Sequence, residues 1–215
     1  YDKSIDYYDR AIKLNPNFVL AYNNKGLALQ EQGNTNLSIS NFEKIISINP
    51  NYPEAYYNLG NCFFKLRDYK SAISNYQIAF DLNSNLKYNF GALLHCKMHI
   101  CDWTNFDENI RILSNRIKSS EVCCSSFALL SLVDSLDLHF KCTQSFAEDK
   151  FLRDNSLGPI HNYKISKKIR IGYYSADFHN HATAYLMAEL FESHDKTKFE
   201  LFAFSVGPNS GDDMR

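Results

Sequence analysis

The chain has 215 residues and a mass of 24.8 kDa, which predicts one or two domains with a core that needs no disulfide support. Hydrophobic residues make up 45% and charged residues 22%, which excludes a disordered or fibrous chain. The net charge is -1, so we expect neither a nucleic acid nor a membrane as a partner. No apolar stretch has the length of a membrane span or the form of a signal peptide, which predicts a cytoplasmic protein.

The sequence begins with Tyr1 rather than Met, so we expect it to be part of a longer polypeptide. Its cysteines lack the paired spacing of a secreted disulfide scaffold, and thiols in the cytosol stay reduced. We expect most of them to be small core residues; the six are Cys62, Cys96, Cys101, Cys123, Cys124 and Cys142.

The first eighty-odd residues contain an internal repeat. Asn15-Pro16-Asn17 recurs 34 residues later as Asn49-Pro50-Asn51 and, in degraded form, as Asn83-Ser84-Asn85. The same step relates three columns of residues, which are Tyr8, Phe42 and Tyr76, then Ile5, Ile39 and Ile73, and then Ala11, Ile45 and Ala79. Their helical spacing predicts that they form the core between repeats.

Each repeat is expected to fold as two amphipathic helices. In the second repeat Pro53 suits a first helical position, residues 67–68 make a turn, and residues 69–82 form the second helix. Gly26 and Gly60 fall inside the first helices, where glycine costs about 1 kcal/mol relative to alanine. We expect both glycines to allow close approach of the partner helix.

The second repeat is similar to the tetratricopeptide family, whose pattern it matches at Tyr56, Leu59, Gly60, Phe63, Ala72, Tyr76 and Ala79. The first repeat departs from that pattern at Lys25 and Ile45. Stacked helix pairs of this kind form a superhelix, and its concave face binds extended peptides or partner helices.

Asn24 and Asn58 stand one repeat apart on the first helices, where asparagine has poor helix propensity. An amide both donates to and accepts from a peptide backbone, so a ladder of asparagines would hold an extended chain without selecting its sequence. The alternative is that both are solvated polar residues on an exposed face. Ala92 occupies the next equivalent position, where the ladder would stop.

From residue 88 the period is lost, while helical patterning continues over residues 89–100, 103–118 and 123–140. This predicts a helical cap or connector. Thr104 and Asp107 fit a capping box, and Trp103 is expected to fill the corner before that helix.

His95, His99 and Cys101 are candidate zinc ligands, because two histidines four residues apart share a helix face. A structural zinc site needs four converging ligands, and no fourth is evident, so we expect no metal. The adjacent Cys123 and Cys124 are expected to be buried, since nothing near them in sequence marks an activated thiolate.

The composition changes after a polar, basic loop over residues 154–168. Residues 169–175 have the pattern of a strand, residues 182–193 that of a helix, and residues 199–205 that of a second strand. A strand, helix and strand in this order predict a βαβ unit and the start of a parallel sheet.

The loop over residues 175–183 follows the first strand, where open parallel sheets bind their ligands. It contains Asp177, His179 and His181 directly before a helix N-terminus, whose backbone amides favour an anion. There is no glycine-rich dinucleotide fingerprint. An ordinary loop with two exposed histidines is the alternative interpretation.

The chain as a whole resembles the protein O-linked N-acetylglucosaminyltransferase family in its bacterial form. The resemblance rests on Cys101-Asp102-Trp103 after the repeats, on residues 168–181 with the motif Asp177-Phe178-x-x-His181, and on His194-Asp195-Lys196 with Phe199-Glu200. By motif position it implies that His181 is the histidine discussed as the catalytic base. Ala182 departs from the proline often found there in eukaryotic-type members.

The resemblance further implies that Asn24 and Asn58 bind acceptor proteins as extended chains, and that Asp177 and His179 belong to the active-site loop. The implied reaction is inverting, metal-independent transfer of GlcNAc from UDP-GlcNAc to Ser or Thr hydroxyls, with no cofactor. The family's second Rossmann-like lobe, which carries most of the donor site, has no counterpart before Arg215. We therefore expect the chain alone to be inactive and its partial sheet to have an exposed edge.

The expected fold is mainly α. Residues 1–86 are assigned to a tetratricopeptide α-solenoid, residues 87–153 to a helical connector, and residues 154–215 to an incomplete Rossmann-like α/β unit, the start of the N-terminal lobe of a GT-B glycosyltransferase. A tetratricopeptide scaffold for protein–protein interaction, without enzymatic activity, is the alternative function.

Overall fold

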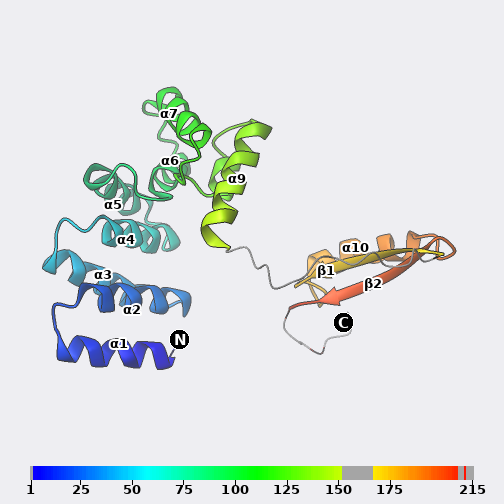
Figure 1. The fold of residues 1–215 in the computed structure, drawn as a ribbon, viewed down its shortest axis with the longest axis horizontal. Helices are drawn as coiled ribbons and strands as arrows, with labels where there is room; N and C mark the ends of the chain where they lie inside the picture. Colours follow the sequence, from blue (N-terminus) through cyan, green and yellow to red (C-terminus); the bar gives the residue numbers. More distant parts are fainter. Residues whose placement is uncertain (1, 152–166, 208–210, 212–215) are drawn as a thin grey trace. The chain divides into compact units, whose positions relative to one another are not determined.

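The computed structural model describes residues 2–151, 167–207 and 211 (Figure 1). The chain divides into two compact units, Tyr1–Asp154 and Asn155–Arg215. All the regular elements described in the first unit are helices, whereas the second unit contains a small parallel sheet. This confirms the predicted fold class. The expected loop over residues 154–168 lies largely outside the described residues.

The first unit begins with consecutive antiparallel helices stacked one upon the next (Figure 1). Pro53 is the first residue of its helix, and residues 69–82 form a helix with the predicted bounds. The helices of this part are α1 (Asp2–Leu14), α2 (Val19–Glu31), α3 (Thr35–Ile48), α4 (Pro53–Lys65) and α5 (Tyr69–Leu82).

The two mid-helix glycines are contact points between paired helices. A Cβ atom added at Gly26 would lie 2.7 Å from the ring of Phe42, and one added at Gly60 would lie 2.6 Å from the ring of Tyr76. Both rings are buried in the core of the repeats. The expectation that these glycines allow close helix packing is therefore confirmed.

The remaining helices of the first unit are α6 (Asn89–His99), α7 (Phe106–Lys118), α8 (Ser126–Leu130) and α9 (Leu136–Lys150). Asn89 joins this part to the repeats, because its buried side-chain amide donates a 3.0 Å hydrogen bond to the carbonyl of Tyr76. Near the end of α9, Asp149 accepts hydrogen bonds from Lys87 and Tyr88, which directly precede α6. These bonds hold the pKa of the Asp149 carboxyl below its ordinary value.

The predicted capping box at Thr104 is wrong. Helix α7 begins at Phe106, and its N-cap is Asn105, whose backbone is left-handed at φ 54°. The Thr104 amide instead donates to the Asp102 carboxylate at 3.0 Å, so this aspartate forms the turn before the helix. Trp103 does not fill the corner, because it is 52% exposed and touches only the edge of Phe106 among the rings described.

The single helix expected over residues 123–140 is also wrong, since α8 and α9 are separated by residues 131–135. Ser125 starts the short α8 by accepting a hydrogen bond from the Ala128 amide at 3.3 Å. The break is stabilised by the ring of His139, which lies 2.8 Å from the Val133 carbonyl oxygen. Local hydrogen bonds thus divide the apolar run into two helices.

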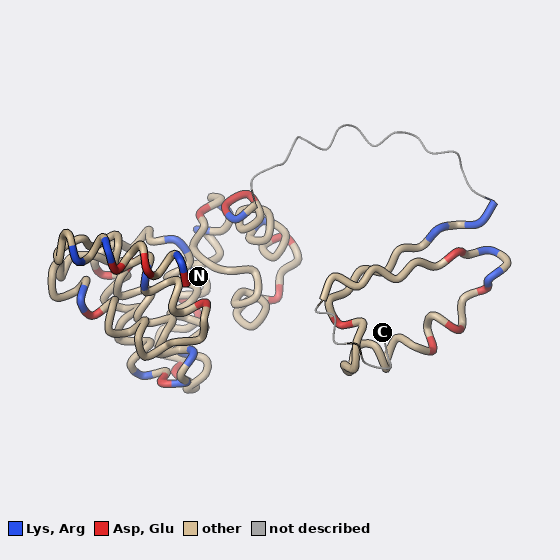
Figure 2. The backbone as a smooth tube through the Cα atoms, turned by 90° about the horizontal axis from the view of Figure 1, so that it is seen from below, with Lys and Arg blue, Asp and Glu red and all other residues tan. Residues whose placement is uncertain are grey.

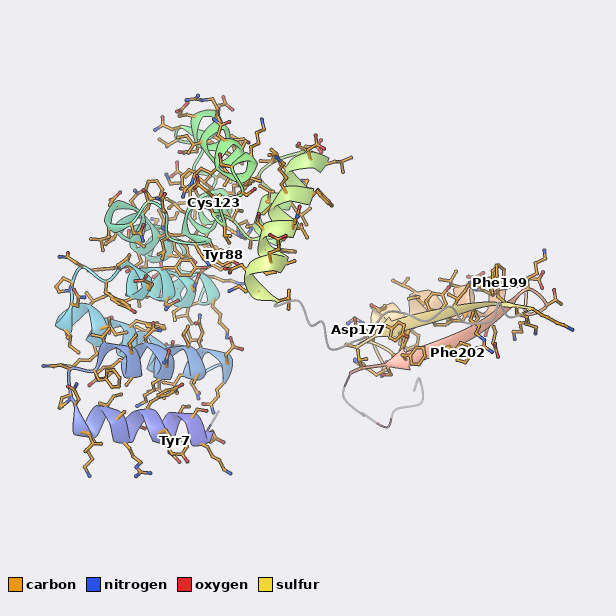
Figure 3. The ribbon with its side chains drawn as sticks, in the orientation of Figure 1. Tyr7, Tyr88, Cys123, Asp177, Phe199 and Phe202 are labelled. Carbon is orange, nitrogen blue, oxygen red and sulfur yellow. The ribbon has the colours of Figure 1, made fainter. Side chains whose placement is uncertain are left out.

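The helices α6 to α9 enclose a second core, which includes Leu113, Ile117 and Leu129. Cys123, Cys124 and Cys142 are buried in it (Figure 3). Burial raises the pKa of the Cys123 thiol to about 11, so it is protonated at neutral pH. All the cysteines are free thiols and five of the six are buried, which confirms their expected role; Cys101 is exposed.

The second unit is the predicted βαβ unit, formed by β1 (Ile169–Ser175), α10 (Ala182–Ser193) and β2 (Phe199–Ser205). The strands are parallel, with Ile169 opposite Phe199. The helix packs on one face of the sheet, where the ring centroids of Tyr173 and Phe191 are 4.9 Å apart.

Acidic and basic residues are interspersed over the helices of the first unit (Figure 2). None of the helices described here combines the length and the apolar character needed to span a bilayer.

We predict that Gly60→Ala lowers the free energy of unfolding by about 1–3 kcal/mol, because the new methyl group collides with the Tyr76 ring. Urea unfolding followed by circular dichroism measures the change. In a double-mutant cycle with Tyr76→Leu the two losses should be far from additive. Additive losses would show that the collision with the Tyr76 ring is not what destabilises Gly60→Ala.

Candidate functional site

The histidine-containing loop begins at the carboxyl end of β1 and ends at the N-terminus of α10, as predicted. The Val206 amide donates to the Ser175 carbonyl at 3.0 Å, so the chain after β2 runs beside the start of this loop. A Cβ atom at Gly207 would lie 1.9 Å from the Ala176 carbonyl oxygen, which leaves room only for glycine. The backbone on this side of the loop is therefore closely packed.

His181 is the N-cap of α10. Its Nδ1 atom accepts a 3.2 Å hydrogen bond from the Thr183 amide and lies 3.1 Å from the Thr183 hydroxyl. Because an amide N–H only donates, Nδ1 must carry its lone pair in this arrangement. The proton of the neutral ring then resides on Nε2, and the exposed side chain presents an N–H donor.

The structure brings His179 close to His181, with their ring centroids 5.5 Å apart. The His179 carbonyl also accepts a 2.6 Å hydrogen bond from the His181 amide. Asp177 is half-buried at the start of the loop, where its amide donates to the Ser175 hydroxyl at 3.0 Å (Figure 3). No contact within the described residues joins its carboxylate to either histidine ring.

The cap determines what His181 can do chemically. With Nδ1 occupied, Nε2–H donates a hydrogen bond to an oxygen, which suits a phosphate or a hydroxyl group. To accept a proton at Nε2, the ring must carry its proton on Nδ1, and the bond from Thr183 is then lost. The local geometry thus couples proton acceptance to the release of the helix cap.

We predict that neutral His181 is in the Nε2–H form. Long-range ¹H–¹⁵N correlation spectra of the imidazole rings distinguish the two tautomers, and Thr183→Pro, which removes the capping amide, should increase the Nδ1–H fraction. Thr183→Ser retains that amide and serves as the control. A predominantly Nδ1–H ring in the unmodified chain would contradict the cap.

The two asparagines of the expected ladder lie in different environments. Asn58 is 8% exposed, and its side-chain amide donates to the Asn23 side-chain oxygen at 3.0 Å. Asn23 in turn donates to the side-chain oxygen of the exposed Asn24 at 3.5 Å. The role of Asn23 could not be predicted from the sequence, because Tyr57 stands one period later and no asparagine column marks the position.

We predict that Asn58→Ala lowers the free energy of unfolding by about 1 kcal/mol, since it removes a partly buried hydrogen bond between repeats. Asn24→Ala should change it by less than about 0.5 kcal/mol, because this side chain is exposed. Urea unfolding of both variants provides the measurement. Equal losses would mean that the two amides have the same structural role.

The candidate zinc ligands belong to an aromatic cluster. The ring of His99 stacks on Tyr69 at 4.7 Å and lies 4.9 Å from the ring of His95. Phe64 contacts both histidines edge-on or tilted. Within the described part of the chain, no group of three or more His, Cys, Asp or Glu side chains could hold a metal ion.

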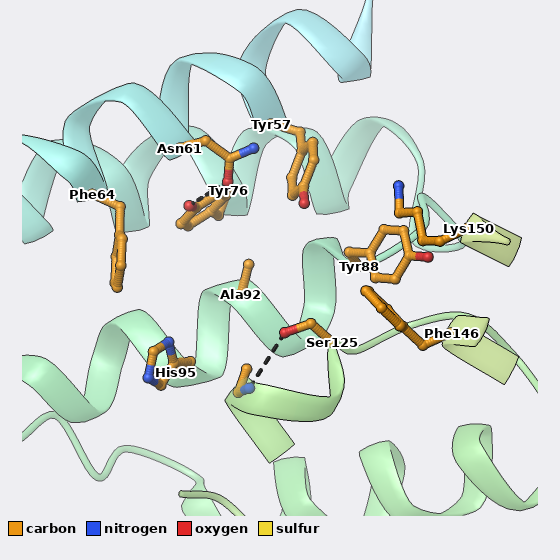
Figure 4. A pocket seen from close by; sticks show the side chains of 11 residues that line it. Tyr57, Asn61, Phe64, Tyr76, Tyr88, Ala92, His95, Ser125, Phe146 and Lys150 are labelled. Atoms are coloured by element: carbon orange, nitrogen blue, oxygen red, sulfur yellow. Dashed lines mark hydrogen bonds between the residues drawn. The ribbon is translucent and has the colours of Figure 1, made fainter. Parts of the chain in front are cut away.

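The first unit contains an aromatic pocket of about 270 Å³ (Figure 4). It is lined from α4, α5, α6, α8 and α9, with Tyr88 at the start of α6. This pocket was not predicted from the sequence. The one available signal was the spacing of Tyr57, Asn61 and Phe64, which places them on one face of a helix.

Comparisons with known proteins agree with these two units. Residues 151–215 match Glycosyl transferase family 41, residues 53–86 match the Tetratricopeptide repeat family, and residues 1–33 and 31–67 match TPR repeat. In Caenorhabditis elegans, a UDP-N-acetylglucosamine–peptide N-acetylglucosaminyltransferase is 30% identical over 132 residues, which are 54% of this chain and 11% of that protein. A probable enzyme of the same name, SEC, from Arabidopsis thaliana is 37% identical over 49 residues, which are 23% of this chain and 5% of the relative.

Among solved structures, a mutant O-GlcNAc transferase of Thermobaculum terrenum aligns with 98% of this chain and 34% of its own, at 18% identity and a TM-score of 0.46. The crystal structure of MamA aligns with 67% of this chain and 83% of its own, at 21% identity and a TM-score of 0.47.

The fold and the family matches define a tetratricopeptide-repeat chain that continues into a glycosyltransferase segment. The predicted resemblance to the protein O-linked N-acetylglucosaminyltransferase family is confirmed. The chain spans only 11% and 5% of the length of the two curated relatives described above.

Proposed function

We propose that this chain acts within a protein O-GlcNAc transferase, which moves N-acetylglucosamine from UDP-GlcNAc to Ser or Thr hydroxyls of proteins. The observation that supports this most is the occurrence of tetratricopeptide repeats and a glycosyl transferase family 41 segment in one chain. The repeats bind the acceptor polypeptide in this proposal, and the second unit contributes to the active site. The reaction takes place in the cytoplasm.

The transfer is an inverting displacement at the anomeric carbon. The acceptor oxygen forms the new bond, the bond from the sugar to the diphosphate breaks, and UDP leaves with the bonding electron pair. The hydroxyl proton must pass to a base, and the charge that develops on the diphosphate must be stabilised. No metal or further cofactor takes part in this scheme.

His181 is the proposed catalytic residue, with Asp177 and His179 in the same loop. In the capped arrangement its Nε2–H donates to an oxygen of the acceptor or of the leaving diphosphate. As a base, it takes the hydroxyl proton on Nε2 after the Thr183 amide has released Nδ1. Exposure of the ring beside a helix N-terminus supports contact with an anionic substrate.

We predict that His181→Ala in the complete protein lowers turnover at least about 100-fold, the usual scale for loss of a general acid or base. Transfer of radiolabelled GlcNAc from UDP-GlcNAc to an acceptor protein measures it. His181→Ala also removes the N-cap of α10, so it should lower the free energy of unfolding by about 0.5–2 kcal/mol without unfolding the protein. Glu192→Ala, an exposed change farther along α10, is the control and should retain full turnover.

A tetratricopeptide scaffold without enzymatic activity is the second candidate, and the matches over residues 1–86 favour it as much as the first. Peptide binding by the complete protein without any GlcNAc transfer would establish the scaffold function. Transfer that is unaffected by His181→Ala would leave the enzyme and remove this histidine from the catalytic residues.

A further inference from the structure

The aromatic pocket of the first unit is formed by side chains of the last repeat and of the helices that follow it. Tyr57, Asn61 and Phe64 are on one face of α4, in the helix that contains Asn58. Tyr76 forms the base, where its ring lies 5.9 Å from that of Tyr57 and its hydroxyl donates to the Asn61 side-chain oxygen at 2.8 Å (Figure 4). A polar contact is therefore fixed among aromatic walls.

The opposite wall comes from α6 and α9. The rings of Tyr88 and Phe146 meet edge-to-face at 5.9 Å, and Ala92 points between the walls (Figure 4). His95 also lines the pocket, and burial together with the neighbouring His99 lowers its pKa from the ordinary value. Its ring is therefore neutral at pH 7.

The charge at the rim comes from Lys150. Its ammonium group lies 4.8 Å from the centroid of the Tyr88 ring, and none of the described residues that line the pocket carries a carboxylate. The adjacent Asp149 bonds to Lys87 and Tyr88 and also feels the charge of Lys150, but Lys150 makes no direct ion pair within the described ranges of the chain. The rim is thus positive and complementary to an acidic group.

The size and walls of the pocket suit one large side chain. Its volume of about 270 Å³ is below the ~300–1,000 Å³ typical of small-molecule sites. Aromatic walls favour an aromatic or aliphatic occupant, which gains both apolar burial and ring contacts.

We infer that this pocket binds one aromatic or large aliphatic side chain of the polypeptide held by the repeats, while an acidic residue next to it contacts Lys150. The inference rests on the proposed binding of acceptor chains by the repeats. It would add sequence preference to the backbone recognition expected from an asparagine ladder.

Fluorescence polarisation with labelled synthetic peptides tests the inference on the whole chain. The parent peptide carries Phe-Glu in a Gly, Ser and Thr background, and three variants replace Phe by Ala, Glu by Gln, or Glu by Lys. Loss of the Phe side chain should weaken binding at least about 10-fold. Replacement of Glu by Gln should weaken it about threefold at low salt, and Lys should weaken it further.

Variants of the protein separate the two contributions. Lys150→Gln removes the charge over Tyr88 and leaves a shorter polar side chain, so it should abolish the preference for Glu over Gln and retain the preference for Phe. Lys44→Gln removes the same charge from an exposed position on α3 and should change neither. Ala92→Leu fills the pocket and should abolish the preference for Phe. If this variant does not fold, the affinities of the unmodified chain for the Phe and Ala peptides still test the inference.

Binding that is equal for the Phe and Ala peptides, or a Glu preference that survives Lys150→Gln, would overturn the pocket inference and leave the proposed function intact. Failure of all the peptides to bind would contradict peptide binding by the repeats as well. Competition by UDP against the parent peptide, lost in Ala92→Leu, would assign the pocket to a nucleotide and also overturn the inference.

Discussion

The contact between an aromatic ring and a glycine backbone, made once in each helix pair, is the constraint on which the first unit depends. The ring of Phe42 lies against Gly26 and that of Tyr76 against Gly60, at distances that exclude even a methyl group. Each helix pair is therefore held closer than ordinary side chains allow. Because the contact recurs every 34 residues, successive pairs stack in the same way and present equivalent faces.

Tyr76 connects this packing to the candidate binding surface. Its ring fills the space beside Gly60. Its hydroxyl donates a hydrogen bond to Asn61, and its carbonyl accepts one from the buried side-chain amide of Asn89. One residue thus closes a helix pair, orients a polar group in the aromatic pocket, and joins the repeats to α6. A rigid base of this kind limits the entropy lost when a peptide side chain binds.

In the second unit, His181 combines a structural and a proposed chemical role. One ring nitrogen of this N-cap histidine accepts a hydrogen bond from the helix, and the other remains available as a donor. Asp177 and His179 come from the same short connection between β1 and α10, so the sheet and the helix determine where all three side chains lie. The chemistry proposed for this loop depends on that placement.

The sequence by itself determined the repeats and the glycine contacts, because they recur at a fixed step of 34 residues, and it determined the βαβ unit, because each of its elements has its own local hydrophobic pattern. It did not determine the divided helix after Cys124 or the turn at Asp102, where competing local hydrogen bonds decided. The partner of Asn58 and the aromatic pocket were decided only by the tertiary structure. Their residues lie far apart in the sequence, from Asn23 to Lys150, and no periodicity relates side chains that meet only when separate helices pack.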